Sequence, residues 1–172
     1  MQQREYFAVE KIYDGVKMDD TTVFDSDIFA RWLYKPRFIS EDGILNERFV
    51  SLRVFPGNVP EKGISGQLLN RAGHNSVISC GKKFRRTAKD GTIKEERFVG
   101  YAKVDVGDIR GISKKVSDNV DVVLTDAAEI PFHAEIRFVI DGQGIDGNHI
   151  DARFLKYKDK LTELFSKDIV FV

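Results

Sequence analysis

PFHAEIRFVI, residues 131–140, is the stretch of sequence that decides the fold. From Phe132 to Phe138 apolar and polar side chains alternate, and this period of two is the pattern of a β-strand with one face against a core. The alternation places His133, Glu135 and Arg137 on one face of the strand, opposite an apolar face of Phe132, Ala134, Ile136 and Phe138. We therefore predict a strand over 133–140.

Strands are also predicted on both sides of this stretch. Short runs rich in β-branched and aromatic residues, bounded by turn residues, are typical of strands. Such runs occupy 6–12, 49–55, 77–84, 92–106, 120–124 and 168–172. Asp90-Gly91 separates the runs 77–84 and 92–106, and Asp-Gly between two such runs predicts a β-hairpin.

Helices are fewer and mostly short. Apolar residues at a spacing of three to four predict one from Asp25 or Ser26 through Leu33. A second is predicted over 63–73, with Gly73 at its C-terminal cap, and the stretch 107–111 suits a single turn. The long helix is Ala152 to Ser166, with Asp151 as its N-cap. Its apolar side is formed by Phe154, Leu155, Leu161, Leu164 and Phe165, and its basic side by Arg153, Lys156, Lys160 and Lys167.

Strands outnumber helices and do not alternate with them regularly, so we predict an α+β fold. The expected architecture is a mixed, mostly antiparallel sheet with a few short helices and one amphipathic C-terminal helix. The length of 172 residues fits one domain, 1–172.

Composition narrows the classes of function. The 27 Lys and Arg balance the 27 Asp and Glu, so any attraction for nucleic acid or for a membrane surface must come from a local patch. The single cysteine, Cys80, allows no intramolecular disulfide, and we predict that it is a small buried hydrophobic residue. No apolar stretch resembles a signal peptide or a membrane span, so we predict a cytoplasmic protein without membrane partners.

The polar face of the 133–140 strand is the first candidate site. It brings an imidazole, a carboxylate and a guanidinium, those of His133, Glu135 and Arg137, to the two-residue repeat of a strand. Such a row can transfer protons or bind a phosphate. The alternative is a solvated strand face without chemistry, because alternation alone produces the same pattern.

The second candidate is the predicted hairpin, which is basic. Residues 82–97 hold seven Lys or Arg and three Asp or Glu, an excess of four. The cations are Lys82, Lys83, Arg85, Arg86, Lys89, Lys94 and Arg97, with Phe84 between them. Cations and aromatic rings along one ribbon are suited to a phosphate backbone. The alternative is an exposed hairpin that its charges keep soluble.

No metal or cofactor is predicted. His74, His133 and His149 are isolated, without a spacing that zinc ligands require. The glycine-containing stretches lack the spacing of a phosphate loop, and no Gly-x-Ser-x-Gly elbow is present.

Several short motifs together resemble small uncharacterised bacterial proteins with a C-terminal Pro-x-His-Ala-x-Ile-like segment. In chain order these motifs are Asp27-Ile28-Phe29-Ala30-Arg31-Trp32, Arg37-Phe38, Leu45-Asn46-Glu47-Arg48-Phe49, Ser51-Leu52-Arg53, the stretch 104–110 and Pro131-Phe132-His133-Ala134-Glu135-Ile136. Where the family pattern has Asn-Pro, this chain has Ile130-Pro131-Phe132. The resemblance implies a bacterial source and a shared site near His133 and Arg53, without a known activity.

Three hypotheses follow. The first is a non-catalytic cytoplasmic domain that binds a protein or nucleic acid through the basic hairpin, 82–97. The second is a small enzyme on a phosphate-bearing or nucleotide substrate, with His133 as acid or base, Glu135 as its partner, and Arg53 and Arg37 holding the anion. The third is an ADP-ribosyl-transfer-type site built from Arg53, Tyr101 and Glu135 on three strands.

Overall fold

The fold is α+β, with one large antiparallel sheet. The computed structural model describes residues 11–13, 16–18, 22–50, 63–83, 90–91, 96–113, 119–125, 127, 129–140, 143–144 and 152–172. The strands are β1 (Lys11–Tyr13), β2 (Val16–Met18), β3 (Ile28–Lys35), β4 (Ile64–Leu68), β5 (Arg97–Asp105), β6 (Asn119–Leu124), β7 (His133–Ile140), β8 (Gln143–Gly144) and β9 (Ile169–Phe171). The helices are α1 (Leu69–Ala72), α2 (His74–Lys83), α3 (Val106–Arg110) and α4 (Ala152–Ser166).

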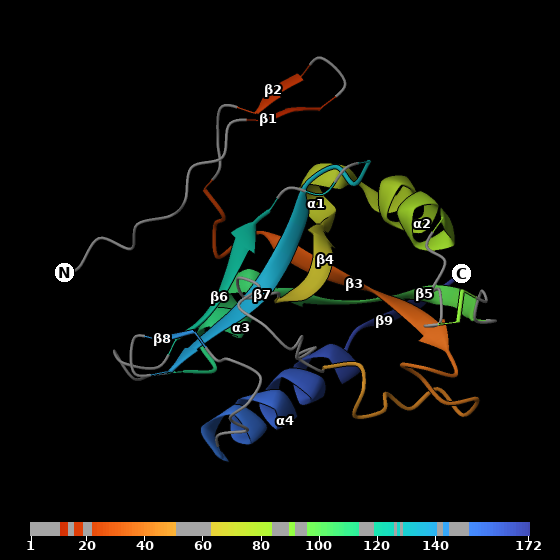
Figure 1. Cartoon of the computed structure of the whole chain (residues 1–172), viewed down its shortest axis with the longest axis vertical. Coiled ribbons are helices and arrows are strands. Elements are labelled where there is room, and N and C mark those ends of the chain that lie inside the picture. Colours follow the sequence, from red (N-terminus) through yellow and green to blue (C-terminus); the bar gives the residue numbers. More distant parts are fainter. Residues whose placement is uncertain are drawn as a thin grey trace.

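The main sheet has the order β6-β7-β4-β3-β5-β9, and β8 pairs with β7 (Figure 1). All its pairings are antiparallel. Strands β1 and β2 pair only with each other among the described strands. The sheet therefore joins segments that are distant in the sequence, and both its central strands have neighbours on two sides.

Strand β3 lies at the centre, and helices cover both of its faces. Trp32 Nε1 donates a hydrogen bond to Val77 O of α2 (2.9 Å), and Tyr34 Oη donates to Gly81 O (2.8 Å). On the other face, Phe29 packs against Phe165 of α4. Helices α2 and α4 consequently lie on opposite sides of the sheet, as Figure 1 shows. The predicted helix from Asp25 or Ser26 through Leu33 is wrong, because a strand covered on both faces loses its polar alternation.

The predicted helix over 63–73 is also wrong in its first half, which forms strand β4. Only Leu69–Ala72 is helical, and Gly73 follows it with a φ of 89°, a conformation that glycine adopts readily. Gly66 allows β3 and β4 to approach closely, because a Cβ there would lie 2.3 Å from Ala30 O. The Ser, Gly and Gln side chains of this strand are atypical of strands and hid it in the sequence.

Helix α2 replaces the predicted strand over 77–84. Val77, Cys80 and Gly81 are its buried residues, at the spacing of three and four that one face of a helix requires. The buried Cys80 confirms the prediction for that thiol. The prediction of a β-hairpin is therefore wrong, because the segment ahead of Asp90-Gly91 that was predicted as its first strand is a helix.

Most other predicted elements are confirmed. Strand β7 and helix α4 have the predicted bounds, and β6, β9 and α3 match to within a residue or two. Phe49 and Val50 are buried in a turn, not in a strand; the remainder of the predicted strand 49–55 lies outside the described residues, as do 6–10, 92–95 and Asp151. On α4, Leu161 and Phe165 are fully buried, but Leu155 is exposed, contrary to the prediction.

Candidate functional site

The polar row on β7 forms as predicted in part. Ala134 and Ile136 are fully buried on one face, and Glu135 and Arg137 contact each other on the other. Arg137 Nη2 lies 3.3 Å from Glu135 Oε2, and the same carboxylate accepts the Gly63 backbone N–H at 3.2 Å. The guanidinium therefore already has an anionic partner within its own strand.

His133 lies in a buried polar cluster at the start of β7. Its side chain is 6% exposed, and its Nδ1 shares a hydrogen bond with Thr125 Oγ1. Across the sheet it pairs in register with Gln67, which is fully buried. The Gln67 amide donates to Pro131 O (2.8 Å) and to Ser76 Oγ (3.3 Å). The imidazole is thus held within the packed sheet, close to helix α2.

Arg37 lies far from this cluster. It follows β3, whereas the His133 end of the sheet lies next to Ala30, and the strand from Ala30 to Lys35 spans roughly 16 Å. Arg37 Nε forms an ion pair with Glu96 Oε1 (3.2 Å), and its guanidinium lies 4.1 Å from the centroid of the Phe38 ring. The structure therefore does not bring Arg37 and His133 together.

The third predicted grouping is also separated. Tyr101 lies on β5 and Glu135 on β7, with β3 and β4 between them, so about 14 Å of sheet divides the two strands. The hydroxyl of Tyr101 instead forms a hydrogen bond with His74 Nδ1 of α2, at 2.7 Å. Arg53, which both catalytic hypotheses use, lies outside the described residues.

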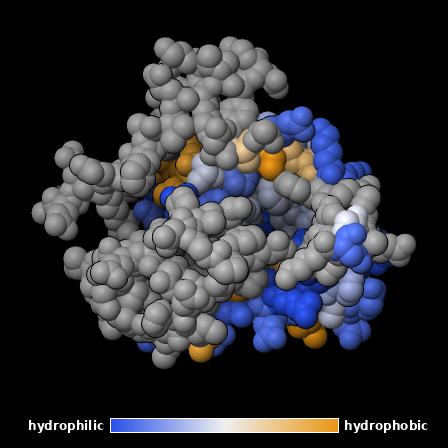
Figure 2. Space-filling model, viewed as in Figure 1, coloured by the Kyte–Doolittle hydropathy of each residue, from blue (hydrophilic) through white to orange (hydrophobic). Residues whose placement is uncertain are grey.

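The basic segment begins on a helix. Lys82 and Lys83 occupy the last turn of α2, and both are exposed. Figure 2 shows hydrophilic residues along the outer margin of the molecule, where Figure 1 places α2. Arg85 and Arg86 follow directly in the sequence but lie outside the described residues.

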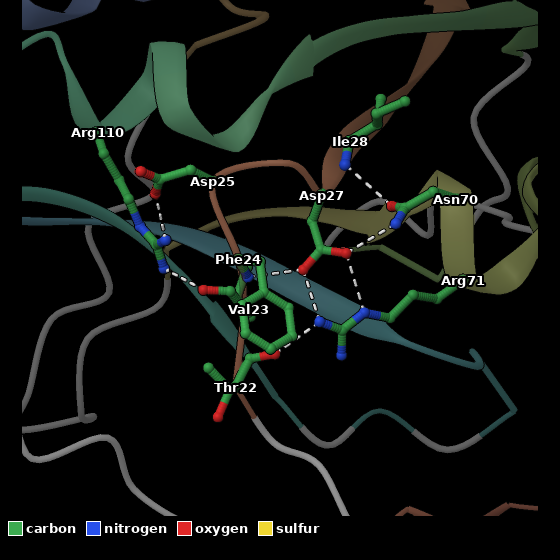
Figure 3. Close-up of polar contacts among 9 residues, drawn as sticks. All are labelled: Thr22, Val23, Phe24, Asp25, Asp27, Ile28, Asn70, Arg71 and Arg110. Atoms are coloured by element: carbon green, nitrogen blue, oxygen red, sulfur yellow. Dashed lines mark hydrogen bonds and ion pairs between the residues drawn. The ribbon is translucent and has the colours of Figure 1, made fainter.

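A buried ionic network that the sequence analysis did not identify surrounds Asp27 (Figure 3). The carboxylate of Asp27 accepts hydrogen bonds from Arg71 at 2.6 and 3.0 Å, from Asn70 Nδ2 at 2.7 Å and from the Phe24 backbone N–H at 2.7 Å. Arg71 Nη2 also donates to Thr22 O. The network fastens the segment ahead of β3 to helix α1.

A second arginine completes this arrangement. Arg110 of α3 pairs with Asp25 (2.7 Å) and with Asp121 of β6 (2.7 Å), and it donates to Val23 O. Figure 3 shows Arg71 and Arg110 approaching the 22–27 segment from two different helices. The two arginines join the 22–27 segment to α1, α3 and β6, and we assign the network a structural role on that ground. Its sequence signal is weak, since its hydrogen bonds join residues up to 87 positions apart.

The Asp27 network makes stability sensitive to acid. Burial raises the pKa of Asp27, but hydrogen bonds from Arg71, Asn70 and Phe24 N, with the Arg71 charge, outweigh it and lower the pKa below its ordinary value of 3.8. A carboxyl whose pKa is lower in the folded state contributes stability above its unfolded pKa, and that contribution is lost as the pH falls through the folded pKa. We expect the free energy of unfolding to fall below about pH 4 in the wild type. The Asp27→Asn variant should show a shallower fall over the same range in urea unfolding, and an identical slope would contradict this assignment.

Within the described ranges, no three His, Cys, Asp or Glu side chains are grouped as metal ligands. Of the helices in those ranges, none is long and apolar enough to cross a membrane. Comparisons with family models, with curated proteins and with solved structures find no match.

Proposed function

We propose that this chain is a non-catalytic, cytoplasmic bacterial domain that binds nucleic acid through the basic segment 82–97. The observation that carries the proposal is the pair of exposed lysines, Lys82 and Lys83, at the end of α2, which only Phe84 separates from Arg85 and Arg86 in the sequence. Four cations within five residues can neutralise several phosphates of one backbone.

Ion pairing elsewhere supports this choice of segment. Of the charged residues in 82–97, Glu96 pairs with Arg37 and Arg97 pairs with Glu41, both from outside the segment, so the excess of four cations is unchanged by these two pairs. Arg71 and Arg110 are held in the Asp27 network and Arg137 by Glu135. An alternative role for the two lysines is their favourable interaction with the dipole at the C-terminus of α2. That effect is only about 0.3–1 kcal/mol, and it does not account for the arginines that follow the helix.

The enzyme hypothesis receives less support from the geometry. A general acid or base must reach its substrate, whereas His133 is buried and bonded to Thr125. An anion-binding arginine needs its donors available, whereas Arg137 contacts Glu135 and Arg37 contacts Glu96. We therefore place the contact with the partner on α2 and the residues that follow it.

Charge reversal tests the proposal. In fluorescence anisotropy with a labelled short oligonucleotide, affinity should fall steeply with salt, because phosphate contacts release counterions. The double variant Lys82→Glu, Lys83→Glu should bind at least about tenfold more weakly and lower the salt slope by about two. Arg85→Glu, Arg86→Glu should act in the same way.

Lys158→Glu on α4 is the control for a general effect of negative charge, because it lies outside the segment. Circular dichroism should show that every variant is folded. Absence of wild-type binding at low salt would refute the proposal. Equal binding of the oligonucleotide and of an acidic polypeptide would favour a protein partner instead.

A further inference from the structure

A groove lies between α3 and α4, on the side of the sheet opposite α2. It encloses about 510 Å³, within the range of small-molecule sites. Three lysines line it, Lys156 and Lys160 of α4 and Lys167 directly after the helix, and we call them the lysine stripe. Among the residues of the segment 82–97 that the structure describes, none lines this groove.

The lysine stripe follows from helical geometry. Positions four residues apart lie on nearly the same side of an α-helix, so Lys156 and Lys160 project from one side of α4. Lys167 follows the last residue of the helix and lines the same groove. The axial rise places the first two about 6 Å apart and the first and last about 16 Å apart. This separation suits two anionic groups of one ligand, or one anion between neighbouring lysines.

These lysines differ from the arginines of the protein. All three are exposed, and within the part of the chain that the structure describes they make no ion pair or side-chain hydrogen bond. Arg71, Arg110 and Arg137 in contrast all contact carboxylates. The ammonium groups of the stripe are therefore available to an anion from solution.

The rest of the lining is apolar or acidic. The apolar part of the lining, which we call the apolar base, consists of the buried Ile112 and Tyr157 with Leu164, and a ring can pack on it. Asp108 and Glu163 also line the groove. Their carboxylates are acceptors only, so they suit hydroxyl or amino groups and disfavour a ligand that is anionic throughout.

The geometry points to a binding site for a nucleotide-like phosphate ester. The lysine stripe would hold the phosphate, the carboxylates would accept hydrogen bonds from sugar hydroxyls or an amino group, and the apolar base would contact the ring. A mononucleotide combines these three features in one molecule of suitable size. The described residues of the segment 82–97 take no part in this site.

Calorimetric titration with ADP tests the site, with pyrophosphate as the phosphate-only probe. ADP should bind the wild type more tightly than pyrophosphate does, because pyrophosphate cannot contact the apolar base. Lys160→Glu should weaken ADP binding by at least about tenfold, since it removes a charge-assisted contact. Lys160→Arg should retain binding, because the cation remains.

Lys158→Glu is the matched control on the same helix. It makes the same change of charge about 160–200° around the helix from the stripe and should leave ADP affinity within about twofold. An equal loss in Lys158→Glu and Lys160→Glu, or no ADP binding by the wild type, would overturn the proposal. Equal affinity for pyrophosphate and ADP would overturn the role of the apolar base. Binding of an oligo-thymidylate without binding of ADP would replace the site with a nucleic-acid contact.

Discussion

Phe165→Ala should lower the free energy of unfolding by about 3–5 kcal/mol, the cost of deleting a buried aromatic ring. Phe165 is 0% exposed, and its ring lies 6.1 Å from the Phe29 centroid and 5.1 Å from the Phe49 centroid, in edge-on arrangements. It therefore joins α4 to the central strand and to the turn that carries Phe49. Urea unfolding followed by circular dichroism measures the change.

Leu155→Ala, on the same helix, is the control. Leu155 is 46% exposed, so its truncation should cost less than about 1 kcal/mol. Similar losses in Phe165→Ala and Leu155→Ala would show that α4 does not pack as described.

Asp27→Ala should lower the free energy of unfolding by about 3 kcal/mol, because it leaves the largely buried guanidinium of Arg71 without its anionic partner. Asp27 is 3% exposed and accepts hydrogen bonds from Arg71, Asn70 and Phe24 N. The loss should appear in urea unfolding at neutral pH, where the carboxylate is ionised.

Asp25→Ala removes a carboxylate two residues away in a different environment. Its side chain is 76% exposed although it lies 2.7 Å from Arg110, and exposed ion pairs contribute about 0–1 kcal/mol. The Asp27→Ala, Arg71→Ala double variant should be less destabilised than the sum of the single variants, because neither charge is then left alone. Additive losses would refute the coupling.

Strand β7 and helix α4 could be predicted from the sequence because each has one face against the core. In β7 this produces a period of two, with Ala134 and Ile136 buried and Glu135 and Arg137 partly exposed. In α4 it produces the helical spacing of Leu161 and Phe165. A pattern is informative where one side of an element faces solvent.

Strand β3 and helix α2 could not be predicted for opposite reasons. All six residues from Phe29 to Tyr34 are buried, so β3 has no polar face to reveal its period. Helix α2 has a short apolar run around Ile78, and its β-branched residues favour a strand. Only the tertiary position, with α2 covering β3, determines both conformations.

The candidate sites were predictable to the extent that they are local. Glu135 and Arg137 meet as expected, because they are two residues apart on one strand. Arg37 and Tyr101 do not reach the β7 row. Their separation could not be predicted, because alternation along a strand does not reveal the order of the strands in the sheet. The contacts of the 22–27 segment with Asn70, Arg71 and Arg110 join residues 43 or more positions apart, and no spacing rule predicts them.

The chain contains one tryptophan, and its position gives the protein an intrinsic fluorescent probe. Trp32 is 5% exposed, and its indole N–H is bonded to Val77 O of α2, so its emission reports whether that helix is docked on the sheet. Helix α4 covers the other face through Phe29. Tryptophan emission can therefore separate loosening of α2, next to the proposed nucleic-acid contact, from events at the α3–α4 groove.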